Sequence, residues 1–260
     1  MEKIFTSEDL RFIAERGSNA DKVAQQFSFF KQGFPFARLD RPATIDDGII
    51  ALGEDELKEL LEDYDDLIEG KTITKFVPAS GAASRMFKDL YSLLEGASCE
   101  SQAKGIAFLK QLTGFAFFDD LKSVMAKQQI NIAKEIENQN YKLIIKYILQ
   151  DCGLNYGQLA KGLLKFHRYD NGSRTAVEEH LVEAAQYARD ASNHCRLHFT
   201  VSSQHKILFE KLLQELVPQY ESRFGVHYEI SFSEQRPATD TLAAEMDNTP
   251  FRNEKGELLF

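Results

Sequence analysis

The chain has 260 residues, a hydrophobic fraction of 43% and a formal net charge of −9 at pH 7. This length and apolar content are sufficient for one large domain with a sizeable core. The acidic balance and the absence of a basic stripe disfavour nucleic acid as a partner, although a few local Lys and Arg side chains can still hold a phosphate.

Cysteine usage and the first residues indicate the compartment. The cysteines, Cys99, Cys152 and Cys195, are odd in number and lack CxxC spacing, which is typical of reduced thiols in a cytoplasm. The opening MEKIFTSEDL is charged from the start and contains no apolar signal region. No window approaches the roughly eighteen apolar residues of a membrane span. We therefore expect a cytoplasmic protein with no membrane partner.

Residues 1–70 are predicted to form an N-terminal helical segment. Helical patterns begin near Ser7 and Asp21, and Gly17 and Gly33 can close them. A stretch broken by Pro and Gly follows. An acidic amphipathic helix then runs through EDELKELLEDYDDLIEG.

Residues 71–260 are predicted to form an α/β domain. TITKFVPA is β-branched and apolar and predicts a buried strand ending at Pro78. Helical patterns follow over about residues 87–158, which we interpret as an insertion. Apolar and polar residues alternate in CRLHFTVS and in VHYEISFS, which predicts a strand on either side of a long helix that contains Pro218. This order favours an α/β fold with a mostly parallel sheet and flanking helices, with ligands at the carboxyl ends of the strands.

Six consecutive small residues, ASGAAS at 79–84, follow the first predicted strand and precede Arg85. At a strand-to-helix turn, unpaired amides and the positive end of the helix dipole form an anion site, and small side chains let a phosphate approach. Arg85 would add a cationic fork. The stretch is neither a Walker A motif nor GxGxxG. Taken alone, it is explained better by a Ser-capped helix packed closely on a strand.

Later segments contain further candidates. Lys161 precedes a short apolar run from which its ammonium could enter a cleft, although such a lysine is more often solvated. A helix is predicted to begin near Thr175, with Glu178 completing a capping box. Gln235 follows a strand and carries the paired donor and acceptor that suit a nucleobase edge or, equally, a loop backbone. Asp240, in an expected loop, is the best metal candidate.

These segments, in this order, resemble known families. ASGAASRM is similar to the GGxGTRM or GGxSxRM loop of sugar-nucleotide pyrophosphorylases, with Ser80 and Ala83 where that pattern has glycines. AKGLLKFHRYDNGSRTAVEEHLVEA resembles their PKPLLPV…PLIEHVL segment, with Ala160 replacing the proline. More closely, nearly the whole chain resembles the bacterial DUF4301 family, whose typical ending is matched by RPATDTLAAEMDNTPFRNEKGELLF.

The resemblance to the pyrophosphorylases implies a nucleotide-diphospho-sugar-transferase type of fold and a nucleotidyltransferase-like function. Such a protein would form a nucleotide sugar from a nucleoside triphosphate and a sugar 1-phosphate, usually with Mg²⁺. The resemblance to DUF4301 also implies that the sequence should continue into a Gly-His-Gly segment. Because the chain stops at Phe260 within an apolar run, we expect it to be truncated at its C-terminus.

The resemblance also implies roles for individual residues. Arg85 would neutralise the developing pyrophosphate, and Lys161 would hold the α-phosphate or the sugar phosphate. Gln235 would contact the base. Gly81, Ala82 and Ala83 would offer their amides to the phosphates. The residues of the loop that are expected to bind the nucleotide are Ser80, Gly81, Ala82, Ala83 and Ser84.

Two alternatives remain open at this point. The substituted glycines and the missing proline are compatible with a non-catalytic module that only binds a nucleotide or sugar phosphate. The Phe-rich stretches GFAFFDD and FSFFKQGFPF, in a chain with 20 phenylalanines, are expected to form core in the helical part. They could also be an exposed docking surface, which would make the protein a helical protein-interaction scaffold.

Overall fold

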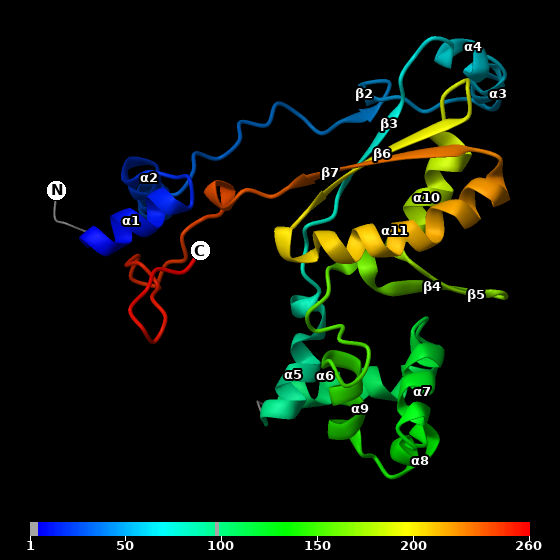
Figure 1. Cartoon of the computed structure of the whole chain (residues 1–260). Helices are drawn as coiled ribbons and strands as arrows, with labels where there is room; N and C mark the ends of the chain where they lie inside the picture. Colours follow the sequence, from blue (N-terminus) through cyan, green and yellow to red (C-terminus); the bar gives the residue numbers. More distant parts are fainter. Residues whose placement is uncertain (1–4, 97–98) are drawn as a thin grey trace. The chain divides into compact units, whose positions relative to one another are not determined.

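A computed structural model describes residues 5–96 and 99–260 and shows a mixed α/β protein (Figure 1). The chain divides into two compact units. The larger unit is residues 64–234, and the smaller unit is residues up to 63 together with 235–260. The C-terminal segment therefore belongs with the N-terminal helices, whereas the sequence analysis had placed it in the α/β domain.

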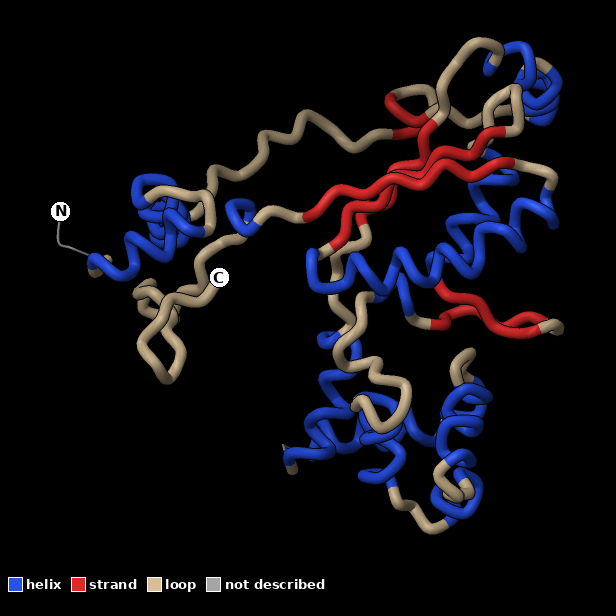
Figure 2. Tube along the Cα trace, viewed as in Figure 1, coloured by secondary structure: helices blue, strands red, loops and turns tan. Residues whose placement is uncertain are grey.

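The larger unit contains a sheet of three parallel strands in the order β3-β6-β7 (Figure 2). The strands are β3 (Thr74–Pro78), β6 (His194–Val201) and β7 (His227–Glu234). The predicted parallel strands are confirmed, with Val77 opposite Phe199 and Phe199 opposite Phe232. Burial alternates along β6, so every second side chain lies on the buried face.

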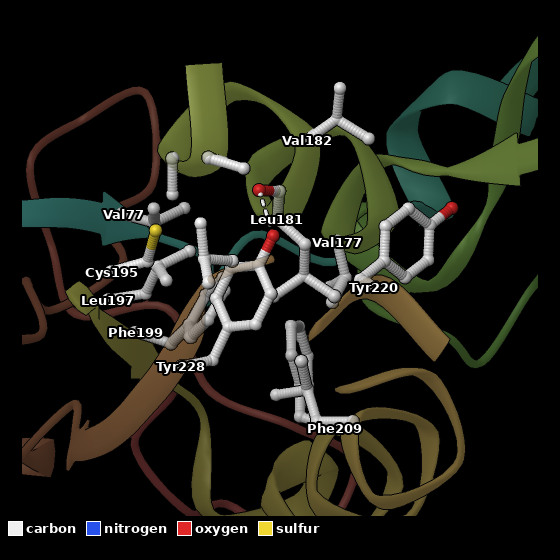
Figure 3. Close-up of a cluster of buried hydrophobic side chains, with 14 of the residues drawn as sticks. Val77, Val177, Leu181, Val182, Cys195, Leu197, Phe199, Phe209, Tyr220 and Tyr228 are labelled. Carbon is white, nitrogen blue, oxygen red and sulfur yellow. Dashed lines mark hydrogen bonds between the residues drawn. The ribbon is translucent and has the colours of Figure 1, made fainter. Parts of the chain in front are cut away.

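Two helices cover that buried face, α10 (Ala176–Tyr187) and α11 (Ser203–Phe224). α11 continues through Pro218, whose missing N–H removes one intrahelical hydrogen bond without ending the helix. Figure 3 shows the resulting core, in which the Tyr228 hydroxyl donates a hydrogen bond of 2.8 Å to the Leu181 carbonyl. Burial raises the pKa of Tyr228, so the hydroxyl remains a donor.

A helical block separates β3 from the rest of the sheet in sequence. Its elements are η1 (Ser84–Phe87), α5 (Lys88–Glu95), α6 (Cys99–Lys110), η2 (Leu112–Gly114), α7 (Phe118–Lys127), α8 (Ile132–Glu137) and α9 (Tyr141–Leu149). The block has its own apolar core, in which Leu121, Met125 and Ile145 are fully buried. Gly105 lets α6 approach α5, since a Cβ there would lie 2.5 Å from the Leu93 side chain.

An antiparallel hairpin leads from η3 (Lys161–Leu163) into α10. Its strands are β4 (Lys165–Tyr169) and β5 (Gly172–Thr175). The capping box predicted at the start of α10 is confirmed. The Thr175 hydroxyl accepts from the Glu178 amide at 3.2 Å, and the Glu178 carboxylate accepts from the Thr175 amide at 2.6 Å. The remaining helix of this unit is α4 (Tyr64–Ile68).

The smaller unit combines short elements from both ends of the chain. They are α1 (Ser7–Glu15), α2 (Ala20–Gln32), β1 (Thr44–Ile45), β2 (Gly48–Ile49), α3 (Glu54–Glu62) and η4 (Pro237–Thr239). Ile13 and Val23 pack with Leu242 and Leu258 in its small apolar core. Across the described ranges of both units, no helix combines the length and apolar character that crossing a bilayer requires.

Candidate functional site

The corner of small residues, 79–84, lies directly after β3 and beside the segment that ends in Lys161. The Ala79 amide donates to the Thr200 carbonyl at 2.7 Å, which extends the pairing of β3 with β6 by one hydrogen bond. The Lys161 amide donates to the Gly81 carbonyl, and the Ala83 amide to the Leu159 carbonyl, each at 3.0 Å. Two segments nearly 80 residues apart in sequence are thus joined by a short backbone ladder.

The amides of the corner differ in availability. Within the part of the chain that the structure describes, the amides of Ser80, Gly81 and Ala82 have no hydrogen bond to protein. The Ala83 amide is already used, and Ala83 is fully buried. The expectation that Ala83 offers its amide to a phosphate is therefore not met. A Cβ built at Gly81 meets nothing within 4 Å, so the loop is open on that side.

The helix after the corner begins later than the sequence suggested. Ser84–Phe87 is a single 3₁₀ turn, preceded by Ala83 without a side-chain cap, and α5 begins only at Lys88. Ser84 therefore does not cap an α-helix. Because the field of a helix dipole falls off within about one turn, its contribution at the corner is smaller than expected.

A cavity of about 220 Å³, which we call the corner cavity, opens beside this loop. Its walls come from the end of β3, the corner, the start of η3, Phe166 on β4, Phe199 on β6 and the first turns of α10. Gly81 and Lys161 both line it. Gly162 permits this arrangement, because a Cβ there would lie 2.9 Å from the buried Phe209 ring.

Lys161 differs from the other lysines of this region. Lys75 pairs with Glu183 and Lys165 pairs with Asp120, each with an N–O distance of 2.7 Å. Lys161 is exposed at the cavity, and among residues 5–96 and 99–260 its ammonium has no ion-pair partner. Such a charge is available to an anionic ligand.

His180 on α10 is a cavity residue that the sequence analysis missed. Its Nδ1 lies 3.1 Å from a Glu183 carboxylate oxygen that also pairs with Lys75. Burial raises the pKa of Glu183, but hydrogen bonds from Lys75 and His180 outweigh it and hold the pKa below its ordinary value. The ionised carboxylate therefore orients the imidazole at the cavity wall. The spacing of His180 and Glu183, three residues apart on a helix, was the available signal.

A second histidine, His205, contacts the segment that precedes Lys161. His205, buried at the start of α11, contacts the Ser202 hydroxyl at 2.6 Å through Nδ1. Its Nε2 lies 2.7 Å from the Gln158 carbonyl oxygen, three residues before Lys161. His205 thereby fixes the loop that carries Lys161 to the carboxyl end of β6.

Arg85 is not among the residues that line the corner cavity. Its side chain is exposed, and the structure gives it no hydrogen bond or ion pair within the described ranges. The following residues, Met86 and Phe87, line a different cavity. Lys161 therefore lines the corner cavity and Arg85 does not.

Gln235 and Asp240 belong to the smaller unit, where they contact each other. The Gln235 amide donates to Asp240 Oδ1 at 3.2 Å, and Arg16 donates to Asp240 Oδ2 at 2.6 Å. A carboxylate neutralised by an arginine does not suit Mg²⁺, which is usually held by free carboxylates and phosphates. In the described part of the chain, no three His, Cys, Asp or Glu side chains form a group suited to a metal.

Comparison with known proteins places the sequence in a family. The profile of the domain of unknown function DUF4301 matches residues 6–260. The chain belongs to the DUF4301 family. No curated protein and no solved structure matches it. In this DUF4301 protein, Gly81, Lys161 and His180 lie around the corner cavity and supply polar groups to it.

Proposed function

We propose that the corner cavity binds the phosphate of a sugar phosphate or nucleotide, and that the protein is nucleotidyltransferase-like. The observation that carries the proposal is the backbone ladder that joins Gly81 to Lys161, two residues that both line the cavity. Among the described residues, the Gly81 amide has no hydrogen bond to protein and the Lys161 ammonium has no ion-pair partner. Backbone N–H groups and a lysine are a common combination for holding a phosphate. Apolar walls around a few convergent polar groups are typical of small-molecule sites.

The size of the cavity favours the smaller of the two proposed substrates. Its volume of about 220 Å³ is below the roughly 300 Å³ at which typical ligand clefts begin. It suits a sugar phosphate better than a complete nucleoside triphosphate. Lys161 would hold the phosphate, and His180 would meet the sugar hydroxyls from α10.

In the proposed reaction, an oxygen of the sugar 1-phosphate attacks the α-phosphorus of a nucleoside triphosphate. A new P–O bond forms, the bond to the β-phosphate oxygen breaks, and pyrophosphate leaves with the electron pair. Catalysis of such a transfer rests on positioning and on charge stabilisation. This site would be of the nucleotide-diphospho-sugar-transferase type, in a cytoplasm that supplies both substrates.

A second candidate is a module that binds the sugar phosphate or nucleotide without transferring it. The position of Arg85 favours this candidate, because Arg85 is exposed and is not among the residues that line the cavity. The two candidates share the phosphate site and differ in turnover.

Thermal denaturation with glucose 1-phosphate, UTP and ATP tests the shared site. A ligand at a hundredfold excess over its Kd stabilises the protein by about 2.7 kcal/mol. Lys161→Met should abolish most of that stabilisation, whereas Lys142→Met, at an exposed position on α9, should preserve it. Equal ligand stabilisation in both variants would contradict the site. Release of pyrophosphate from the paired substrates then separates transfer from binding alone.

A further inference from the structure

A second cavity, of about 210 Å³, lies within the larger unit beside the helical block. We call it the aromatic cavity. The function proposed above does not use it. The aromatic side chains that line it are Phe87, Phe108, Phe115, Phe117, Tyr156 and Phe166.

The aromatic rings of this cavity are held in a defined arrangement. Phe108 stacks on Phe115 with ring centroids 4.4 Å apart, and Phe115 stacks on Phe117 at 5.5 Å with an interplanar angle of 7°. Phe117 meets the ring of Tyr156 edge-on at 5.3 Å. Contacts of this kind fix ring orientation, so the walls are preorganised for a flat or narrow apolar group.

Two polar side chains beside the cavity, Tyr156 and Lys165, have partners in the protein. The Tyr156 hydroxyl accepts a hydrogen bond of 3.4 Å from the Lys165 amide, and burial raises the pKa of Tyr156 to about 12. The Lys165 ammonium pairs with Asp120 at 2.7 Å. A nucleobase bound here would leave its own donors and acceptors unpaired, which is costly in an apolar site. The mainly aromatic lining therefore favours an apolar occupant.

We propose that the aromatic cavity is a binding site for an apolar group the size of a single substituted benzene ring or a short hydrocarbon chain. An apolar cavity of about 150 Å³ in another protein stays dry and binds benzene. The volume of about 210 Å³ leaves room for a substituent on such a ring. Protein interiors are close-packed, and unfilled space loses dispersion contacts, so an occupant of this size is stabilising.

The cavity also has a route to solvent. Met86 and Phe166 line it and are themselves 45% and 42% exposed, so the mouth lies between two side chains that can change rotamer. Phe166 also lines the corner cavity. The inference nevertheless requires only the aromatic cavity and stands whether or not a phosphate binds next to it.

Toluene and uracil, two rings of similar size but opposite polarity, test the proposal on the full chain. Toluene should raise the melting temperature in a concentration-dependent way, and titration calorimetry should show saturable binding. Uracil should have no effect. Absence of a toluene shift would overturn the proposal, and a shift with uracil alone would overturn the apolar assignment.

Substitutions locate the binding. Ala116 lines the cavity, so Ala116→Leu should fill it and weaken toluene binding at least tenfold. Ala133→Leu, the same change at an exposed position on α8, should leave binding unchanged. If Ala116→Leu does not fold, Met86→Trp closes the mouth from an exposed position instead. Toluene affinity that is unaltered in the folded variants would show that it binds elsewhere and overturn the assignment.

Discussion

In the smaller unit, Asp9 pairs with Arg252 at 2.7 Å and Asp240 pairs with Arg16 at 2.6 Å. In the larger unit, Lys161 lines a cavity, and within the described ranges its ammonium has no such partner. All of these residues are charged, but only Lys161 combines free charge with a concave surface. Paired charges hold chain segments together, whereas an unpaired charge in a cavity is available to a ligand.

The two units also differ in apolar core, and we therefore expect the smaller one to depend more on its ion pairs. The larger unit has two extensive apolar clusters, one under the sheet and one in the helical block. Among the described residues, the buried apolar core of the smaller unit comprises Phe5, Ile13, Val23, Phe27, Leu242 and Leu258. The contrast predicts that substitutions of charged residues affect stability in the smaller unit and ligand binding in the larger one.

The largest effect is expected for Asp9→Ala. Asp9 is 5% exposed, accepts two hydrogen bonds from Arg252 and completes the capping box of α1 with Thr6. Removing one partner of a buried ion pair should cost about 3 kcal/mol. Hydrogen exchange of the α1 amides in the full chain measures the loss. Glu8→Ala, at an exposed neighbour, should change it by less than about 0.5 kcal/mol. Equal effects would contradict the structural role of the pair.

The same pair predicts how the smaller unit responds to acid. The hydrogen bond from Arg252 lowers the pKa of Asp9 to about 2, against the opposing effect of burial. A lowered pKa stabilises the fold fully above the ordinary value of 3.8, and this stabilisation is lost as pH falls towards 2. The protection of the α1 amides, taken relative to the intrinsic exchange rate at each pH, should therefore fall between about pH 4 and pH 2. Asp9→Asn should remove that pH dependence, and a profile unchanged by it would rule out Asp9 as the cause.

Much of the larger unit could be predicted from the sequence because its signals are local. The alternation around Leu197 and Phe199, and the capping residues Thr175 and Glu178, follow from short-range periodicity and hydrogen bonding. The division into units could not be predicted in this way. Packing of Leu258 near Ile13 joins positions about 245 residues apart, and no local pattern reports such a contact.

The candidate site was predictable only in part. The corner and Lys161 were singled out from small residues, an apolar run and a family resemblance, but their adjacency depends on the ladder between Gly81 and Lys161. The position of Arg85 could not be predicted, because the sequence suggested an α-helix that begins at Ser84, whereas Arg85 lies in a 3₁₀ turn that precedes α5. His180 was missed because its surroundings, EEHLVEAA, look like an ordinary solvated helix face.

In the larger unit, Gly162→Ala should reduce stability, by less than Asp9→Ala does in the smaller unit. The added Cβ would lie 2.9 Å from the Phe209 ring and 3.4 Å from Val177, both of which are fully buried. Overpacking of this kind should cost about 2 kcal/mol and displace Lys161 from the cavity. Chemical denaturation measures the stability, and the thermal shift with glucose 1-phosphate measures the binding.

Gly81→Ala is the matched control for Gly162→Ala. A Cβ at Gly81 meets open space, so its effect on the unliganded protein should stay below about 0.5 kcal/mol. The comparison tests whether Gly162 is needed for close packing beneath Lys161. Similar stability of the two variants would show that the Phe209 ring moves aside at little cost.

Apart from the control variants, the smallest expected effect is that of Asp240→Asn. The ion pair with Arg16 is partly exposed, with 32% of the Asp240 side chain accessible, so its loss should cost about 1 kcal/mol. If the Asp240 carboxylate only accepts hydrogen bonds from Arg16 and Gln235, the variant should keep the full thermal shift with glucose 1-phosphate, with or without Mg²⁺. Loss of a Mg²⁺-dependent nucleotide shift in this variant would instead make Asp240 a metal ligand. The charge of Asp240 would then bind a ligand, as proposed for Lys161, and the contrast between the two units would not hold.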